Sequence, residues 1–439
     1  MKLIIQGGKP LKGAVRLGGA KNASFKLMIA SLLNRQESRL LNISKISDVE
    51  NTKKIIVALG GEIRSCGERT LLINSKSIKK FVISTNSFGE MSRSSTMFIG
   101  PLLARFGKAW VPFPGGDKIG PRPLERHFEG LESLGIKLKL SGKMVKASCR
   151  GLRGGHYAFR KNTHTGTETL IMAAVLAKGK TLIENAASEP EVDDLIAFLN
   201  KMGAKITRLP RRKIEIIGVA RLGPVVYKVM PDRNEAVSYA LAAVITKGDI
   251  VVENAQPQHL KSFLAKLDEA GGGYEIGNYG VRFFWKKPLK AVDITTRPHP
   301  GFMTDWQPLW SVLATQSQGK SQITEAVYMD RFNYVKNLIK MGANIKYFQP
   351  KVDNPDKFYN FNLLKGWENY YHGVEIFGPQ PLKAVEAEIP DLRAGATLVL
   401  AGLVSKVGQT KLSAVEQIDR GYENLDGRLN QLGARIKRV

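Results

Sequence analysis

The sequence predicts an α/β fold made of six repeated units, because one short pattern recurs six times along its 439 residues. In each copy a helical stretch leads into a glycine, and a strand-like stretch follows. An apolar residue four positions before the glycine lies on one helix face. Three positions after it stands an aliphatic residue, replaced by Tyr274 in the fourth copy. Glycine adopts a left-handed backbone at a helix end at little cost, so these residues predict six helix C-termini: Gly60, Gly135, Gly203, Gly271, Gly342 and Gly433.

The spacing of these glycines predicts the size of the unit. Successive marker glycines are separated by 75, 68, 68, 71 and 91 residues, and a period near seventy suits a small α/β unit rather than a short solenoid repeat. The surplus in the last interval is placed in an insert at about residues 349–372, which is rich in Phe, Tyr and Trp. A surface hairpin or flap is the favoured interpretation, since aromatic residues suit strands. Stacking on nucleic-acid bases is the alternative.

Six units divide evenly into two domains of three units each. The midpoint falls near Val229 to Arg233, where a proline and polar residues fit a hinge. A cleft between two such lobes commonly holds the substrate of an enzyme.

Composition limits the classes of protein to which the chain can belong. No apolar run approaches the roughly 18 residues of a membrane span, and the first twenty residues lack a secretory apolar core, so we expect a cytoplasmic protein. Two cysteines and six scattered histidines argue against a disulfide framework or a zinc site. The formal net charge is +27, but the bases are spread along the chain. This distribution favours a generally basic surface over a concentrated nucleic-acid site.

The most informative segment is the loop 114–123, PGGDKIGPRP, between an apolar run at 109–113 and a helical pattern at 124–134. Its prolines and glycines shape the backbone and display Asp117, Lys118 and Arg122. Two interpretations stay open from composition alone: an anion-binding loop, or an ordinary turn between strand and helix.

Two further segments lie at predicted helix starts. The sequence GGAKNAS places Lys21 and Asn22 at a helix N-terminus, where free N–H groups and the helix dipole favour an anion. The sequence TGTE at 165–168 matches a capping box for a helix over 169–177. Simple capping explains the second segment equally well.

Together these segments resemble one family. In order along the chain stand GGAKNAS, PGGDKIGPRP, HTGTETLIMAAVLAKG, ENAASEPEVDDL, VMPDRNE, HPGFMTDWQ, ITEAVYMDRF, DLRAGATLVLAG and IDRGYENLDGRL. This series resembles the UDP-N-acetylglucosamine 1-carboxyvinyltransferase family of enolpyruvyl transferases. The resemblance implies two domains, each an inverse α/β barrel of three repeated units. It places the first domain at 21–230, with the loop 114–123, and the second at 1–20 plus 231–439.

The resemblance also implies the reaction and its parts. The enolpyruvyl group of phosphoenolpyruvate passes to the 3'-hydroxyl of UDP-N-acetylglucosamine through a tetrahedral ketal, and phosphate leaves; the step begins peptidoglycan precursor synthesis. No metal or organic cofactor is expected, the partners are these two small molecules, and a monomer is expected. The implied catalytic residues are Asp117 as acid and Asp305 as base, with Lys21, Arg122, Arg393 and Arg420 around phosphoenolpyruvate. The implied substrate-binding residues are Asn22, Arg93, Pro123, Leu124, Glu125, Arg126, Thr165, Gly166, Val327 and Arg331.

Asp117 departs from the commoner pattern, because most members of the family carry a cysteine there. A carboxylic acid must be protonated to donate to the methylene carbon. Neighbouring bases lower its pKa, whereas burial and the charge of bound phosphoenolpyruvate raise it. We expect substrate binding to tip this balance. A carboxylate is also a poorer nucleophile than a thiolate, so resistance to the epoxide fosfomycin is expected.

Three alternatives remain. The shikimate-pathway enolpyruvyl transferase shares the implied fold, but its serine-rich motif after the helix-entry lysine fits Asn22 to Phe25 poorly. A sixfold repeat of high positive charge also suits a ring clamp on DNA, which would show salt-sensitive binding without phosphate release. A catalytically lapsed homologue is the third alternative, although every expected charged position is filled.

Overall fold

The computed structural model describes residues 1–84, 93–113 and 124–439, with the backbone alone at 93 and 94. These residues form two compact units. The terminal unit consists of Met1–Leu17 and Pro231–Val439, and the internal unit consists of the described residues between Gly18 and Met230. The described strands form six sheets, three in each unit.

The same strand arrangement recurs from sheet to sheet. A first strand runs parallel to its neighbour, and two antiparallel pairings follow. In the internal unit the orders are β13 (Val226–Lys228), β3 (Glu37–Leu41), β5 (Thr70–Asn74), β4 (Glu62–Ser65); and β9 (His156–Ala158), β10 (Lys180–Glu184), β12 (Lys213–Ile217), β11 (Lys205–Leu209). The third sheet has β6 (Lys108–Pro112), β8 (Met144–Ser148) and β7 (Lys137–Ser141), and a parallel bridge from Val82 to Trp110 takes the place of the first strand.

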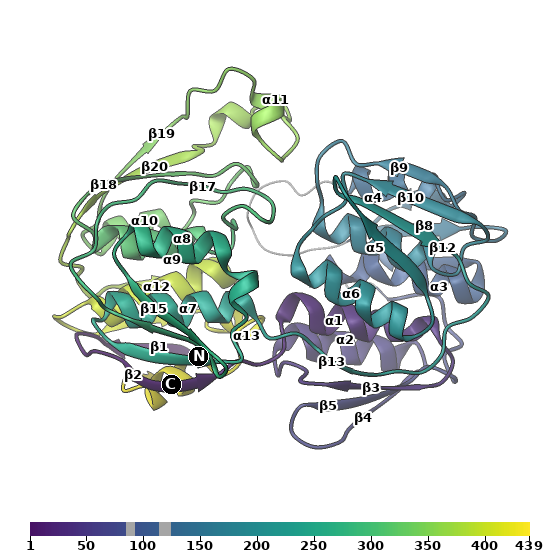
Figure 1. Ribbon diagram of the computed structural model, residues 1–439, viewed down its shortest axis with the longest axis horizontal. Helices are drawn as coiled ribbons and strands as arrows, with labels where there is room; N and C mark the ends of the chain where they lie inside the picture. The colour runs from purple at the N-terminus through teal and green to yellow at the C-terminus, as the bar shows by residue number, and fades with distance from the viewer. Residues whose placement is uncertain (85–92, 114–123) are drawn as a thin grey trace. The chain divides into compact units, whose positions relative to one another are not determined.

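The terminal unit repeats this arrangement three times. Its orders are β2 (Lys12–Arg16), β14 (Asp249–Glu253), β16 (Gly280–Phe284), β15 (Gly273–Gly277); β17 (Ile294–Thr295), β18 (Gly319–Thr324), β20 (Gly373–Gly378), β19 (Asn344–Phe348); and β21 (Glu386–Glu388), β22 (Thr410–Ser413), β1 (Lys2–Gln6), β23 (Arg435–Arg438). In the last sheet β1 pairs with both β22 and β23. The two ends of the chain therefore lie in one sheet, as the N and C marks in Figure 1 show.

The marker glycines end helices, as the sequence predicts. Each follows one of six helices: α2 (Ser47–Ala58), α4 (Glu125–Glu132), α6 (Pro190–Lys201), α8 (Lys261–Glu269), α10 (Val335–Lys340) and α14 (Leu425–Gln431). All six glycines have a positive φ, between 78° at Gly135 and 102° at Gly203. A residue with a Cβ rarely adopts this backbone conformation. This explains why glycine recurs between each of these helices and the antiparallel strands that follow it.

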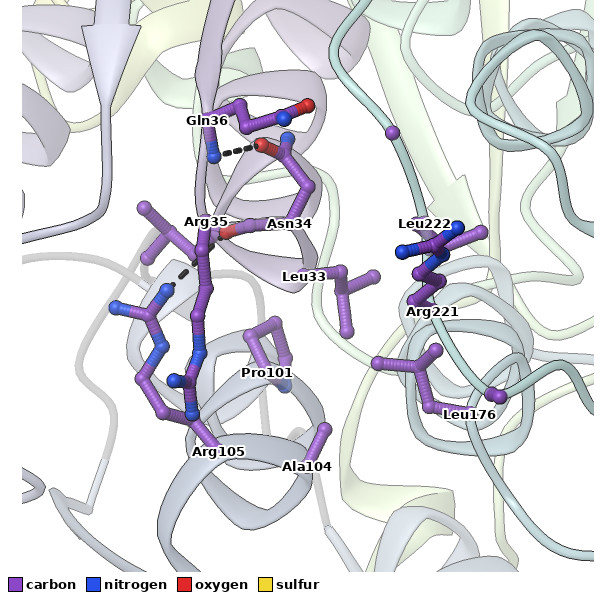
Figure 2. Close-up of a pocket in the computed structure, with 13 residues that line it drawn as sticks. Leu33, Asn34, Arg35, Gln36, Pro101, Ala104, Arg105, Leu176, Arg221 and Leu222 are labelled. Carbon is purple, nitrogen blue, oxygen red and sulfur yellow. Dashed lines mark hydrogen bonds between the residues drawn. The ribbon is translucent and has the colours of Figure 1, made fainter.

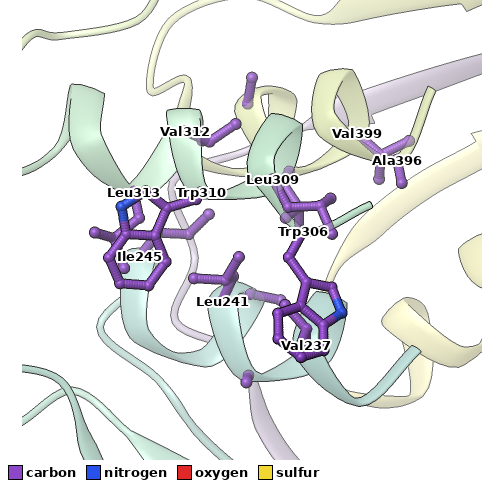
Figure 3. Close-up of a cluster of buried hydrophobic side chains, with 14 of the residues drawn as sticks. Val237, Leu241, Ile245, Trp306, Leu309, Trp310, Val312, Leu313, Ala396 and Val399 are labelled. Atoms are coloured by element: carbon purple, nitrogen blue, oxygen red, sulfur yellow. The ribbon is translucent and has the colours of Figure 1, made fainter. Parts of the chain in front are cut away.

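Three further helices in each unit are almost wholly buried and form its core. They are α1 (Lys21–Ala30), α3 (Ile99–Phe106) and α5 (His164–Ala174) in the internal unit, and α7 (Arg233–Ile245), α9 (Gln307–Thr315) and α12 (Leu392–Val404) in the terminal unit. Figure 3 shows Leu241 of α7 between the Trp306 and Trp310 rings, and Leu309 of α9 and Val399 of α12 belong to the same buried cluster. Helices inside and sheets outside make each unit an inverse α/β barrel, so the predicted fold class is confirmed.

The aromatic insert connects β19 to β20. Residues 349–372 contain two short helices, α11 (Pro355–Phe358) and η5 (Trp367–Asn369). Tyr359 and Phe361 are buried against Ala326 and Met329, and Trp367 stacks on His372 with the ring centroids 5.4 Å apart. These rings pack on one another and form a small core, which accounts for the aromatic composition.

None of the helices in the described ranges is long and apolar enough to cross a membrane.

A buried carboxyl group on α6 makes the stability of the internal unit pH-dependent. Burial raises the pKa of Asp194 to about 7, although Tyr227 donates a hydrogen bond to it at 2.8 Å. The unfolded pKa is about 3.9, so the folded state binds more protons between these values and loses stability as the pH rises through the window. Between pH 5.5 and 7 we expect the free energy of unfolding of the wild type to fall by about 1.5 kcal/mol relative to that of Asp194→Asn. Urea unfolding at each pH measures this difference.

Tyr227→Phe should extend this pH dependence of stability, whereas Asp194→Asn should remove it. Tyr227→Phe removes a hydrogen bond that lowers the pKa of Asp194, so the loss of stability with rising pH should extend to higher pH. Parallel curves for the wild type and Asp194→Asn would contradict the assignment.

Candidate functional site

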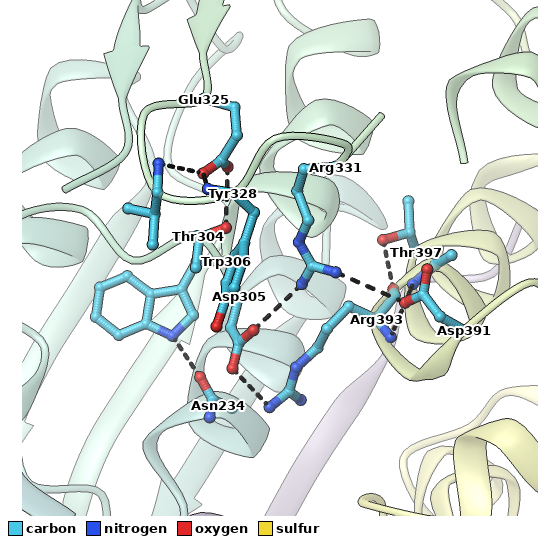
Figure 4. Close-up of polar contacts among 12 residues, drawn as sticks. Asn234, Thr304, Asp305, Trp306, Glu325, Tyr328, Arg331, Asp391, Arg393 and Thr397 are labelled. Atoms are coloured by element: carbon cyan, nitrogen blue, oxygen red, sulfur yellow. Dashed lines mark hydrogen bonds and ion pairs between the residues drawn. The ribbon is translucent and has the colours of Figure 1, made fainter. Parts of the chain in front are cut away.

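The terminal unit holds a cluster of charges around Asp305, just before α9. Arg331 Nη2 lies 3.2 Å from Asp305 Oδ1, and Arg393 Nη2 lies 3.1 Å from Asp305 Oδ2. Both arginines are less than a twentieth exposed, whereas the Asp305 side chain keeps 22% of its surface accessible. Figure 4 shows the two guanidinium groups converging on this carboxylate. Asp305, Arg331 and Arg393, which the sequence predicts as site residues, are therefore brought together.

Asp391 contacts the backbone of Arg393 and the guanidinium of Arg331, and the sequence analysis did not single it out. Its Oδ1 caps α12 by accepting hydrogen bonds from the backbone N–H groups of Arg393 and Ala394 at 2.9 and 3.1 Å. The same oxygen lies 3.8 Å from Arg331 Nη1. A helix cap and an ion pair thus share one carboxylate. An aspartate two positions before an arginine at the start of an apolar run was the available signal.

Burial and charge set the protonation states behind the cluster. Burial lowers the pKa of Arg393, but Asp305 and Tyr422 outweigh that effect and raise it overall. Burial raises the pKa of the Tyr422 phenol despite the nearby Arg393. Tyr422 accepts a hydrogen bond from Arg393 Nη1 at 3.1 Å and lies 2.8 Å from the Ser238 hydroxyl. Arg393 therefore remains a cation with its guanidinium held on two sides.

Glu325 organises the loop that carries Val327. Its carboxylate accepts hydrogen bonds from the N–H groups of Val327 and Tyr328 at 2.8 and 3.0 Å and from the Thr304 hydroxyl at 2.9 Å. Burial raises the pKa of Glu325, against the opposing effect of Arg331. Thr304 precedes Asp305, so Glu325 links the Val327 loop to the Asp305 segment. This second acid was also missed from the sequence.

Arg420 lies at the C-terminal end of a short helix, α13 (Glu416–Asp419). Its Nη1 donates to Gln417 Oε1 at 3.4 Å, and its side chain is partly exposed.

In the internal unit Lys21 is the first residue of α1, as predicted. Its ammonium lies 2.6 Å from Asp48 Oδ2, and both side chains are nearly buried. Asn22 follows at the second position and is partly exposed. Asp48 stands in the first turn of α2, so two helix starts meet at this ion pair. Asp48 was not among the predicted residues.

The helix starts of α4 and α5 also lie together. Arg126 Nη1 donates to the carbonyl oxygen of Asn162 at 3.3 Å, and His127 Nε2 lies 2.9 Å from Thr165 Oγ1. Leu124 is buried at the N-cap of α4, and Glu125 begins that helix as an exposed residue.

The capping box expected at 165–168 is wrong. The N-cap of α5 is Thr163, whose side chain accepts from the Gly166 N–H at 3.3 Å, and the helix begins at His164. Glu168 instead makes an ion pair with Lys26 of α1 at 2.5 Å. The opportunity to pair two buried charges decided the role of Glu168, and sequence spacing does not report it.

Asp117, Arg122 and Pro123 lie outside the described residues. Arg93 begins the 3-10 helix η3 (Arg93–Phe98), and its side chain also lies outside them.

Comparison with known proteins identifies the fold and the family. A sequence model of the EPSP synthase family (3-phosphoshikimate 1-carboxyvinyltransferase) matches residues 5–429. The solved structure of the enolpyruvyl transferase NikO from Streptomyces tendae aligns with a TM-score of 0.85 at 22% identity, covering 99% of this chain and 98% of that one. An EPSP synthase structure from Acinetobacter baumannii aligns with a TM-score of 0.72 at 18% identity over the whole of both chains.

Closer relatives come from sequence comparison. A UDP-N-acetylglucosamine 1-carboxyvinyltransferase from Sorangium cellulosum (strain So ce56) is 40% identical over 438 residues, covering 99% of this chain and 98% of that protein. A protein of the same name from Chlamydia trachomatis serovar D is 39% identical over 431 residues, covering 97% and 95%. The chain therefore belongs to the enolpyruvyl transferase family, within the group of UDP-N-acetylglucosamine 1-carboxyvinyltransferases.

Proposed function

We propose that the protein transfers the enolpyruvyl group of phosphoenolpyruvate to the 3'-hydroxyl of UDP-N-acetylglucosamine and releases phosphate. The observation that most supports this is the accessible Asp305 carboxylate held 3.2 and 3.1 Å from two buried arginines. An ionised carboxylate accepts a proton from a hydroxyl, and two fixed guanidinium groups hold it in one orientation. The names of the full-length relatives supply the substrate.

The reaction divides into an addition and an elimination. Asp305 takes the hydroxyl proton while the sugar oxygen bonds to C2 of phosphoenolpyruvate, and Asp117 gives a proton to the methylene carbon. The ketal then returns a proton from the new methyl group to the Asp117 carboxylate, the double bond to C2 forms, and phosphate leaves with the electrons of the broken C–O bond. Lys21, Arg122, Arg393 and Arg420 bind the phosphate and carboxylate, with Arg93 and Arg331 as further cations. Planar guanidinium groups make two parallel hydrogen bonds to such anions.

The uridine nucleotide is assigned to Asn22, Pro123, Leu124, Glu125, Arg126, Thr165, Gly166 and Val327. The contacts that join Arg126 to Asn162 and His127 to Thr165 support this assignment, since they hold two of its segments together. Both substrates are phosphorylated metabolites, so we place the protein in the cytoplasm. We further propose that it acts as a monomer at the first step of peptidoglycan precursor synthesis.

The decisive experiment measures phosphate release from phosphoenolpyruvate with UDP-N-acetylglucosamine or shikimate 3-phosphate as acceptor. Release should depend on UDP-N-acetylglucosamine, and shikimate 3-phosphate should give only the background seen without acceptor. Release with shikimate 3-phosphate alone would identify the protein as a shikimate-pathway enolpyruvyl transferase. Release with neither acceptor would overturn the proposal.

Fosfomycin tests the role of residue 117. The wild-type enzyme should keep full activity during incubation with fosfomycin, because a carboxylate attacks the epoxide poorly. Asp117→Cys should acquire time-dependent, irreversible inactivation and gain the mass of one adduct. Asp117→Ala is the matched control and should gain no adduct. Time-dependent inactivation of the wild type, together with an adduct that is absent from Asp117→Ala, would contradict the expectation.

A further inference from the structure

The internal unit contains a cavity of about 710 Å³. Figure 2 shows its walls. Its lining includes Leu33, Arg35, Pro101, Arg105, Leu176 and Arg221. Ligand pockets commonly measure 300–1,000 Å³, so the cavity has room for a small organic molecule.

The cavity lies at the C-terminal ends of the three buried helices. Leu32 and Leu33 belong to η1 (Ser31–Leu33), directly after α1, while Arg105 is near the end of α3 and Leu176 follows α5. Lys21 begins α1, and ten helical residues span about 15 Å. The cavity is therefore distinct from the Lys21–Asp48 ion pair at the opposite end of the same helix.

Positive charge dominates the part of the cavity wall that the described residues form. Among them, three arginines line the cavity, and no aspartate or glutamate does. Arg35 and Arg221 are exposed and pair with none of the acidic side chains in the described ranges. Arg105 donates to the carbonyl oxygen of Asn34 at 3.1 Å and to Ser75, and burial followed by the charge of Arg35 lowers its pKa. An anion at this place would relieve the repulsion between Arg35 and Arg105.

An apolar surface separates the charged sides. Figure 2 shows Arg35 and Arg105 on one side and Arg221 on the other, with Leu33 and Pro101 between them and Leu176 below Arg221. An adjoining cavity of about 660 Å³ shares Ala104, Leu176 and Ala220. It adds Arg150 and Lys178 to the lining, and none of its described lining residues is acidic. The ligand that fits this surface carries negative charge on an apolar body.

We propose that this cavity is a second binding site, which takes a small amphiphilic anion. Arg35 and Arg221 hold its carboxylate or phosphate group, and Leu33, Leu176 and Leu222 contact its apolar part. Guanidinium groups suit both anions, so the choice between carboxylate and phosphate is left to experiment.

Fluorescence titration with 1-naphthyl phosphate and 1-naphthoate tests the site, with inorganic phosphate and 1-naphthol as the two halves of the ligand. One or both naphthyl anions should bind at least about tenfold more tightly than either half, and the tighter anion identifies the head group. Binding should weaken as salt rises, because the arginines are exposed. Equal binding of 1-naphthol and the naphthyl anions would overturn the proposal.

Variants locate the binding. Arg35→Gln with Arg221→Gln should weaken it about tenfold for each arginine, and Ala220→Trp, which fills the shared wall from an exposed loop, should abolish it. Arg39→Gln, an exposed arginine outside the cavity, and Lys21→Ala should both leave the binding unchanged. Phosphate release by the two cavity variants should match the wild type and shows that they are folded. Loss of binding in Lys21→Ala together with unchanged binding in Ala220→Trp would overturn the proposal.

Discussion

Replacing Asp305 by asparagine should lower kcat for phosphate release about 10²- to 10⁴-fold, the range typical for loss of a general base. Asparagine keeps the shape of the side chain and can still accept a hydrogen bond from Arg331 or Arg393. It no longer takes a proton from the sugar hydroxyl. The KM values should change far less than kcat, because the residue acts mainly in the chemical step.

Steady-state kinetics with both substrates varied provides the measurement. Asp353→Asn, a charge-neutralised exposed aspartate in the insert, is the matched control and should keep wild-type kinetics. An Asp305→Asn enzyme within threefold of the wild-type kcat would remove the base role. In that case the ion pairs with Arg331 and Arg393 would be structural only.

Replacing Lys26 by methionine should destabilise the internal unit by about 3–5 kcal/mol, because it leaves the Glu168 carboxylate buried without its cation. Lys26 and Glu168 are 2% and 0% exposed, and their charged atoms are 2.5 Å apart. For a unit of about 200 residues this loss corresponds to a fall in Tm on the order of 10 °C. Thermal unfolding followed by circular dichroism measures it.

His164 makes the size of this loss pH-dependent. Burial lowers its pKa, but Glu168 at 3.2 Å outweighs burial and Lys26, so the pKa is raised overall. A raised histidine pKa contributes stability below the unfolded pKa, near 6.5, and that contribution is lost as the pH rises through the folded pKa. Charged His164 partly replaces Lys26 in the variant. The loss should therefore be smaller at pH 6 than at pH 8.

The double variant Lys26→Met with Glu168→Gln is the matched control. It removes both charges, so it should recover most of the lost stability. If the double variant is as unstable as Lys26→Met alone, the unpaired carboxylate is not the cause. Packing around the methionine would then account for the effect.

Much of the local structure was predictable because it depends on neighbouring residues. Each marker glycine ends a helix whatever the tertiary context, since only glycine adopts the positive φ cheaply, as at Gly203. Lys21 begins α1 as predicted, directly after Ala20, whose ψ of 128° is not helical. Asp305, Arg331 and Arg393 were named through ordered motifs, and the structure brings these three together.

Other features were not predictable, because they depend on contacts between distant segments. Glu168 has the spacing of a capping residue, yet it faces Lys26, 142 positions earlier in the sequence. Removing two charges from water together costs less than leaving one alone, and that comparison requires both positions in space. Asp391 and Glu325 likewise acquire their roles from the arginine and the backbone groups that fold against them.

The sequence by itself determined the repeated α/β unit, the six helix C-termini marked by glycine, and the family, because these depend on periodicity and on short motifs in a fixed order. Only the tertiary structure decided which buried charges pair, where α5 begins, how Asp391 and Glu325 support the site, and that an arginine-lined cavity lies at the ends of three helices. Burial makes the free energy of a charge depend on its neighbours in space, and a linear pattern does not specify those neighbours.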